Sequence, residues 1–166
     1  HQGGFGMLNP QDADLNEMTD PVTPQVKAID AIDIREKNFQ QMHKVGVTDA
    51  WSTPGSGNVI CGQAFATKTW GGSIREMAVK EPCALKLALG GNPKGVYGPK
   101  GQMPMTRMGV AAVLFDNFEK AAQYKMKKDQ GKEQPWNEKY EAMLPALNGE
   151  VPLKIHCEQF DMLTAI

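Results

Sequence analysis

The sequence predicts an α/β fold in which parallel strands alternate with helices. Short apolar segments typical of strands alternate along the chain with longer segments whose apolar residues recur at helical spacing. The chain has 166 residues, of which 41% are hydrophobic and 22% are charged. This length and composition are typical of a globular protein with a buried core, so we expect one α/β unit with about four strands.

The first half of the chain is predicted to contain a loop, a helix, a strand and a hairpin, in that order. Residues 1–24 are rich in Gly, Asn, Asp and Pro and are expected to form a long loop. A short amphipathic helix over 35–44 then leads to a buried strand over 47–51. Turn residues follow at 53–57, and the loose alternation of 59–70 indicates a β-hairpin or arm.

The clearest element of the second half is a helix over 106–128. Val110, Leu114 and Phe118 recur in it at helical spacing, and Thr106 is its expected N-cap. The other predicted elements are a strand at 84–89, a glycine-rich loop at 90–95, a helix at 137–147 ended by Asn148-Gly149, a strand at 151–156 and the start of a helix at 160–166.

Charge and cysteine content exclude several classes of function. The formal net charge is −1, so nucleic acid and anionic membranes are not expected partners. A lysine cluster between Lys120 and Lys132 is interpreted as a solvated helix end. The three cysteines form no C-x-x-C pair, which argues against a structural zinc site or a disulfide framework and favours free thiols in the cytoplasm. No apolar run reaches the roughly 20 residues of a membrane span.

The strongest candidate for chemistry lies at the end of the last predicted strand. Residues two apart on a strand point to the same face, so Lys154, His156 and Glu158 should share one face. Leu153 and Ile155 should share the other. A neutral imidazole is a suitable ligand for zinc or iron, and a neighbouring carboxylate can orient it or move a proton. The alternative is an ordinary strand-end histidine between two solvated side chains.

Two further histidines were considered as ligands. His43 lies on the predicted helix 35–44 and is expected to be exposed, whereas His1 stands at the start of the chain. Neither residue alone supports a metal site, because catalytic zinc needs at least three protein ligands.

Nucleotide binding is a third possibility, raised by the glycine-rich loops. Neither loop has the G-x-x-x-x-G-K-[ST] pattern of a phosphate-binding loop. The order Asn92-Pro93-Lys94 is also expected to interrupt a helix start that could bind phosphate. These loops are therefore interpreted as connections between strands and helices.

Several motifs follow one another over nearly the whole chain. The longest are Pro54-Gly55-Ser56-Gly57-Asn58-Val59-Ile60, Ala88-Leu89-Gly90-Gly91-Asn92-Pro93-Lys94 and Pro152-Leu153-Lys154-Ile155-His156. Shorter ones occupy 16–17, 19–24, 28–32, 46–48, 62–63, 96–98 and 106–109. Together they resemble the amidohydrolase superfamily, and within it the amidohydrolases related to imidazolonepropionase.

The resemblance implies a (β/α)8 TIM-type barrel with a divalent metal, zinc or iron, at its mouth. Such barrels take about 250 residues, so this chain is expected to hold a partial barrel of roughly strands two to five, with a β-hairpin insertion. The chain would then be one incomplete barrel domain, with a loop over 1–24 and an α/β core over 25–166.

The resemblance also assigns roles to individual residues. His1 matches the second histidine of the family's His-x-His metal motif, and His156 matches the metal-binding histidine at the end of the fifth strand. Many relatives carry Glu where this chain has Gly91, so a single metal is expected. Glu158 is the candidate catalytic proton carrier.

The function implied for the parent protein is metal-dependent hydrolysis of C–N bonds in a cyclic amide or dipeptide-like substrate. The chain lacks most of the family's metal ligands and is expected to be inactive alone, with or without a bound metal. The alternative is a non-catalytic binding or interaction module on a partial amidohydrolase scaffold. Because a partial barrel leaves strand edges open, we expect self-association into a homo-oligomer through those edges.

Overall fold

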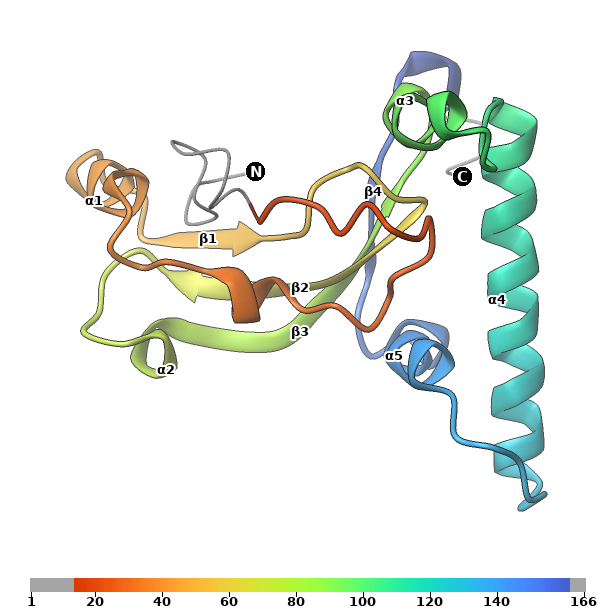
Figure 1. Cartoon of the computed structure of the whole chain (residues 1–166). Helices are drawn as coiled ribbons and strands as arrows, with labels where there is room; N and C mark the ends of the chain where they lie inside the picture. Colours follow the sequence, from red (N-terminus) through yellow and green to blue (C-terminus); the bar gives the residue numbers. More distant parts are fainter. Residues whose placement is uncertain (1–13, 162–166) are drawn as a thin grey trace.

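The computed structural model describes residues 14–161 (Figure 1). Its strands are β1 (Asp49–Ser52), β2 (Ile60–Lys68), β3 (Ala78–Ala88) and β4 (Leu153–His156). Its α-helices are α1 (Lys37–Lys44), α2 (Ile74–Met77), α3 (Gly91–Tyr97), α4 (Arg107–Asp129) and α5 (Glu138–Leu147). Single 3-10 turns are η2 (Ala28–Ala31), η3 (Gly98–Lys100) and η4 (Gln159–Asp161).

The strands form one mixed sheet in the order β1-β2-β3-β4. β1 pairs with β2, and β2 with β3, in antiparallel fashion, whereas β3 and β4 are parallel. The predicted parallel pairing is therefore right for β3 and β4 and wrong for the other two pairs. Short connections join β1, β2 and β3 and permit antiparallel pairing, whereas helices α3 to α5 form the long crossover that a parallel pair requires.

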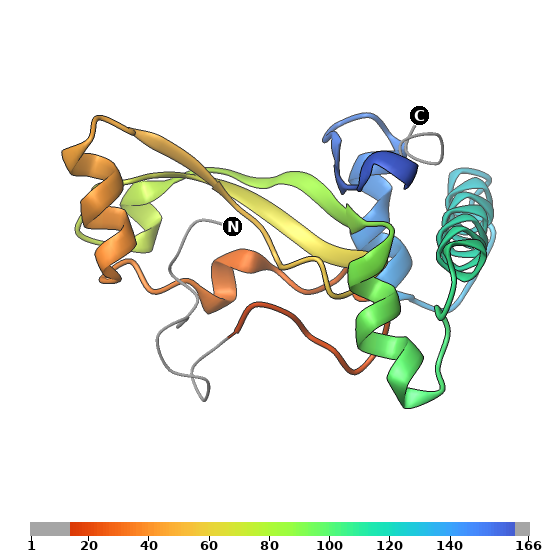
Figure 2. The same cartoon turned by 90° about the horizontal axis from the view of Figure 1, so that it is seen from above.

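The sheet curls along its length and has different surroundings at its two ends. Figures 1 and 2 show an arm made of β1 and the distal parts of β2 and β3, with α1 and α2 at its tip and α3, α4 and α5 at the opposite end. This mixed α/β architecture is compatible with part of a barrel. The hairpin predicted within 59–70 is wrong, because these residues form the single strand β2, which builds the arm together with β1 and β3. The assignment to barrel strands two to five stays a prediction.

The two faces of β3 have different roles. Leu85, Leu87 and Leu89 are each 1% exposed and belong to the main apolar core, which α4 and α5 complete. The core residues of these helices are Val110, Leu114 and Ala121 of α4 and Met143 of α5. In Figures 1 and 2, α5 lies between the sheet and α4. The opposite face of β3 carries Ala84, Lys86 and Ala88.

The two long predicted helices are confirmed, together with the residues that begin them. The hydroxyl of Thr106 accepts a hydrogen bond from Gly109 N at 3.0 Å at the start of α4, and the side chain of Asn137 accepts one from Tyr140 N at 3.1 Å at the start of α5. These bonds satisfy backbone N–H groups that a helix leaves unpaired in its first turn. The helix predicted over 35–44 is α1, in which His43 is exposed as expected and stacks on Trp70.

The glycine-rich segment was predicted as a loop, and this prediction is wrong over most of its length. Helix α3 begins at Gly91 and contains Pro93 in its first turn. Proline is tolerated there because its missing N–H would have no partner inside the helix. The turn before α3 requires glycine, because Gly90 has φ +73° and the Asp161 carboxylate fills the position that a Cβ would take.

The strand and loop predictions of the first half also need correction. β1 is not buried, since Trp51 is 45% exposed. The described end of the predicted loop is held against the sheet, because Val22 forms a parallel bridge to Ile60 and Thr23 N donates to Ile60 O at 2.9 Å. The helix expected from residue 160 begins as η4, and residues 162–166 lie outside the described part.

Surface and cysteine features agree with the sequence interpretation. Lys120, Lys125 and Lys128 form ion pairs with carboxylates of α4 or α5, as expected of a solvated face. All three cysteines are free thiols. Within residues 14–161, no helix is both long and apolar enough to cross a membrane.

Replacing Leu87 with Ala is expected to lower the free energy of unfolding by about 2–5 kcal/mol, because it removes buried methyl groups and leaves a cavity. The same substitution at Leu153, which is 43% exposed on β4, should cost less than about 1 kcal/mol. Urea denaturation followed by circular dichroism measures both values. Equal losses in the two variants would contradict the assignment of the core to this face of β3.

Candidate functional site

His156 ends β4 and lies beside the end of β3, with Ala88 as its partner in the sheet. Its Nε2 is 3.0 Å from the side-chain nitrogen of Asn92, in the first turn of α3. An amide nitrogen can only donate, so Nε2 is the acceptor in this contact. The contact fixes the orientation of the ring.

A pocket opens in front of this pair. Its walls come from four parts of the chain, namely the segment 15–18, the loop 55–57, α3 and the end of β4. Polar groups in the lining include Asn16, Ser56, Asn92 and His156, and apolar ones include Met18 and Val96. The pocket therefore combines an imidazole, a hydroxyl and amides with an apolar wall, as small-molecule sites commonly do.

The loop that carries Ser56 is fixed by the segment before it. Gly57 N donates to the side-chain oxygen of Asn16 at 2.7 Å, and Gly55 N donates to Leu15 O at 2.6 Å. The Asn16 side chain fills the space where both glycines would otherwise carry a Cβ. Any larger residue at position 55 or 57 would push Asn16 away, so glycine is needed on both sides of Ser56.

A buried polar network supports the pocket from below. Asn58, which is 1% exposed, accepts a hydrogen bond from the Tyr97 hydroxyl at 2.6 Å. The amide nitrogen of Asn58 donates to the Thr23 hydroxyl and to Glu17 O, both at 2.7 Å. Burial is the main cause that raises the pKa of Tyr97 to about 12, so the phenol remains a donor at neutral pH.

Lys86 lies on the same face of β3 as Ala88 and is 2% exposed. Its Nζ is 3.0 Å from Ser56 Oγ and 2.9 Å from Leu87 O. Burial lowers the pKa of Lys86, the Cys61 thiol acts in the opposite direction, and the charge of Lys154 lowers it further. A buried amine with a lowered pKa, in contact with a residue that lines the pocket, is a group from which chemistry can be expected.

Glu158 does not share a strand face with His156, because β4 ends at His156. Its carboxylate lies 3.4 Å from the Arg107 guanidinium at the start of α4, and 3.0 Å from the position that a Cβ on Gly91 would occupy. Lys154 does lie on the strand, where its ammonium is 5.4 Å from the centre of the Trp51 ring. Ile155 packs against the core as expected, whereas Leu153 on the same face is largely exposed.

Of the two predicted metal ligands, the structure describes His156. His1 lies outside the described residues. Between residues 14 and 161, no three His, Cys, Asp or Glu side chains come together in a group that could hold a metal ion. His156 contributes one imidazole, and its Nε2 is engaged by Asn92. The described residues therefore do not fit a complete metal site.

Three residues of the pocket region are not among the predicted catalytic groups. Asn92 and Ser56 lie in glycine-containing motifs whose pattern indicates a turn and a family resemblance but no catalytic role. The sequence does mark Lys86 as unusual, since it is the one charged residue in the apolar segment 84–89. A lysine inside a buried strand is unusual and needs a partner, which the sequence could not identify.

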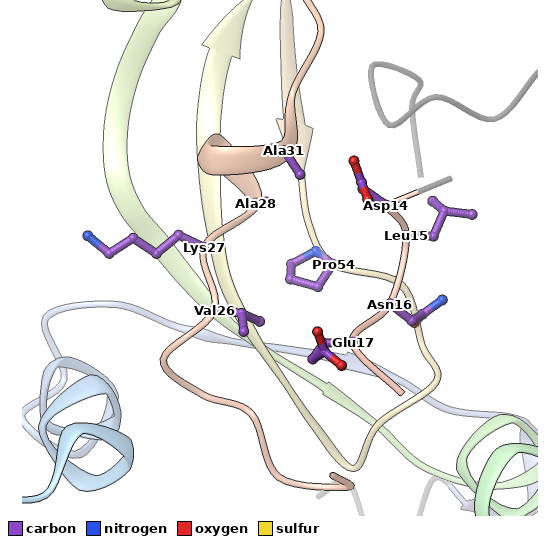
Figure 3. Close-up of a pocket in the computed structure, with 9 residues that line it drawn as sticks. All are labelled: Asp14, Leu15, Asn16, Glu17, Val26, Lys27, Ala28, Ala31 and Pro54. Carbon is purple, nitrogen blue, oxygen red and sulfur yellow. The ribbon is translucent and has the colours of Figure 1, made fainter. Parts of the chain in front are cut away.

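A neighbouring pocket shares Leu15 and Asn16 with the first. Figure 3 shows Pro54 between two of its walls, formed by Val26 to Ala31 on one side and Asp14 to Asn16 on the other. His156 does not line this pocket, so the candidate site is the pocket in front of His156.

Comparison with known proteins identifies two relatives. No known protein-family profile matches the sequence. Amidohydrolase tasK of Hapsidospora irregularis is 30% identical over 183 residues, covering 96% of this chain and 19% of that protein. The crystal structure of an amidohydrolase from Thermotoga maritima MSB8 is 38% identical, with a TM-score of 0.93 over 99% of this chain and 45% of that one. The predicted resemblance to amidohydrolases is confirmed, and the chain spans less than half of either relative.

Replacing Tyr97 with Phe is expected to lower the free energy of unfolding by about 1–3 kcal/mol, because it leaves the buried oxygen of Asn58 without its donor. Tyr140→Phe on α5 is the control, since the described residues offer its hydroxyl no hydrogen-bond partner, and it should have little effect. Chemical denaturation of the three proteins tests this. Equal stability of Tyr97→Phe and the wild type would show that the network does not support the pocket.

Proposed function

We propose that this chain, which is related to the amidohydrolases, is a segment of a metal-dependent enzyme that hydrolyses C–N bonds. The observation that carries the proposal is the position of His156. It stands at the carboxyl end of β4, beside the parallel strand β3, and it lines a pocket with Asn92 and Ser56. Catalytic groups of α/β barrels lie at this end of their strands.

In this proposal His156 is one metal ligand, and further ligands come from residues outside the described part. His1 is the proposed second ligand. A metal of this kind, zinc or iron, supplies a Lewis acid and an activated water. Asn92 holds Nε2 of His156 at 3.0 Å, so this nitrogen is free for a metal only after Asn92 releases it.

The number of metal ions, the substrate and the proton carrier are proposed from the resemblance to imidazolonepropionase-related enzymes. Gly91 leaves no carboxylate at the position where many relatives carry Glu, which supports a single metal. The substrate is proposed to be a cyclic amide or a dipeptide-like molecule. Glu158 is the proposed proton carrier, although its carboxylate is ion-paired with Arg107 in this conformation.

The chain matches only part of each relative, and this affects whether the chain alone can hydrolyse a substrate. It corresponds to 45% of the Thermotoga protein and 19% of tasK. We therefore propose that the chain alone does not turn over substrate. A second candidate function, a non-catalytic binding module, is favoured by the single imidazole that the described residues bring to the pocket. The free thiols favour a reducing compartment, and we propose the cytoplasm.

Metal binding distinguishes the two candidate functions. Equilibrium dialysis with Zn²⁺ or Fe²⁺, followed by elemental analysis, is expected to show binding to the wild-type chain. His156→Ala should lower the affinity by at least about tenfold, because one ligand is lost. His1→Ala should have a similar effect, and His43→Ala, at an exposed position away from the pocket, should have none.

A wild-type chain that binds no metal, or a His156→Ala variant with unchanged affinity, would contradict the metal role of His156. Either result would favour the binding module. Assays of the chain with simple cyclic amides and dipeptides are expected to show no turnover.

We further propose that the chain forms homo-oligomers through the open edges of its sheet. β1 and β4 are the outer strands, and Leu153 on β4 is 43% exposed. The sedimentation coefficient should rise with protein concentration. Leu153→Lys should weaken this association, because a charged side chain opposes pairing at a strand edge.

Val45→Lys is the control for this variant, since Val45 is 77% exposed in the turn after α1 rather than on an edge strand. A wild-type chain that sediments as a monomer at high concentration would exclude association through these edges.

A further inference from the structure

We propose that the outward face of α4 binds α4 of a second copy of this chain, with the two helices antiparallel. Figures 1 and 2 show α4 along one side of the molecule, with α5 and the sheet on its inner side. Three large apolar side chains of α4 are mostly exposed, namely Met108 (79%), Phe115 (62%) and Met126 (53%). Apolar side chains that gather on one exposed face mark an interaction surface.

These side chains belong to an apolar stripe with the spacing of a coiled-coil seam. Its members follow one another at alternating intervals of four and three residues, which places them in line along one side of a helix. Core residues such as Val110, Leu114 and Ala121 lie on the other side of α4. The apolar stripe consists of Met108, Ala112, Phe115, Glu119, Ala122 and Met126, all of them exposed.

The apolar stripe matches itself when its direction is reversed. Met108 and Met126 are its outermost members, and Ala112 and Ala122 stand next to them on either side of the centre. In an antiparallel pair, Met108 therefore faces Met126 of the second copy, and Ala112 faces Ala122. A two-fold interface requires such a self-complementary surface. The small alanines allow the helices to approach closely, and the flexible methionines fill the space at the ends.

Charges beside the apolar stripe also favour the antiparallel direction. Arg107 and Lys125 are 18 positions apart, or about five helical turns, so they lie on the same flank. Arg107 pairs with Glu158 and Asp161, which gives this end of α4 one positive and two negative charges. A two-fold axis brings equal flanks together, so Lys125 of the second copy meets this cluster. Antiparallel packing also places opposite ends of the helix dipoles side by side.

Glu119 is the one polar member of the apolar stripe. Its carboxylate accepts a hydrogen bond from the side-chain nitrogen of Gln123 at 3.2 Å. In the antiparallel pair Glu119 lies beside Phe115 of the second copy, where the carboxylate loses part of its hydration. This cost keeps the association weak and reversible, and it makes position 119 a sensitive site for a test.

This interface is separate from the open sheet edges and does not rest on the proposed C–N hydrolase function. It needs neither metal nor substrate. The test is made in the Leu153→Lys variant, in which a charge opposes pairing at the β4 edge. Failure of this proposal can therefore be told apart from failure of the other two.

Sedimentation equilibrium of Leu153→Lys is expected to show an average mass that rises with concentration toward twice the mass of one chain. Adding Phe115→Lys should weaken this association by at least about tenfold, because it places a charge at the centre of the interface. Adding Glu119→Leu should strengthen it by at least about tenfold, because it removes the buried carboxylate. Val45→Lys, in the turn after α1, is the control and should change nothing.

Disulfide formation tests the direction of the helices. A mixture of Met108→Cys and Met126→Cys chains, oxidised with copper phenanthroline, is expected to give a disulfide between the two new cysteines, identified by peptide mapping. Neither variant oxidised alone should join its own new cysteines. Two copies of either residue would lie at opposite ends of the apolar stripe, roughly 27 Å apart along the helix, whereas a disulfide spans at most about 7 Å between Cα atoms.

Circular dichroism and thermal unfolding check that each variant is folded. A Leu153→Lys chain that stays monomeric at high concentration would overturn the proposal, and so would unchanged association in folded Phe115→Lys. A disulfide between two copies of residue 108, or none in the mixture, would overturn the antiparallel arrangement.

Discussion

The buried side chain of Asn58 holds together the three segments that surround the candidate site. Through hydrogen bonds of 2.6 to 2.7 Å it connects α3, by way of Tyr97, with the segment that contains Glu17 and Thr23. Asn58 itself ends the loop of Ser56. Every partner lies 35 or more positions from Asn58 in the sequence, so the network forms only when the chain is folded. Inside a protein, such a network costs free energy if one partner is missing.

Strand β3 explains how one element serves both the core and the site. Its leucines pack against α4 and α5, while Lys86 and Ala88 face the other way, beside Lys154 and His156 of β4. The alternation of a strand separates these two environments by one residue. A site can therefore be built on the face of β3 opposite the apolar core, and the parallel pairing aligns Lys86 and Ala88 of β3 with Lys154 and His156 of β4.

The curled sheet and the extended arm also occur in a larger solved protein. The chain matches 45% of the Thermotoga amidohydrolase with a TM-score of 0.93, so this part of the fold is the same in both. In the arm β1, β2 and β3 pair in antiparallel fashion, whereas β3 and β4 are parallel. In the described residues, the outer strands β1 and β4 keep a free edge.

Local signals in the sequence determined the elements that depend on nearby residues. The N-cap Thr106, the apolar spacing of α4 and the strand that ends at His156 could all be predicted, because each depends on contacts within about one helical turn or on strand alternation. The resemblance to amidohydrolases could also be predicted, since motif order is a property of the sequence. Helix α3 is not predicted from the sequence, because Pro93 commonly breaks a helix. The structure shows that Pro93 lies in the first turn of α3, where proline is tolerated.

Only the tertiary structure decided which distant groups meet. The contact of Asn92 with His156 and the contact of Lys86 with Ser56 join residues 30 or more positions apart. The direction in which each strand pairs was likewise decided by the fold. The sequence placed Glu158 beside His156 by alternation, but the chain leaves the strand there and Arg107 binds the carboxylate instead. Contacts of this kind depend on how packed elements cross in space, and no local pattern of residues encodes them. The sequence alone thus determined most of the elements and the resemblance to amidohydrolases, whereas the folded chain determined the site.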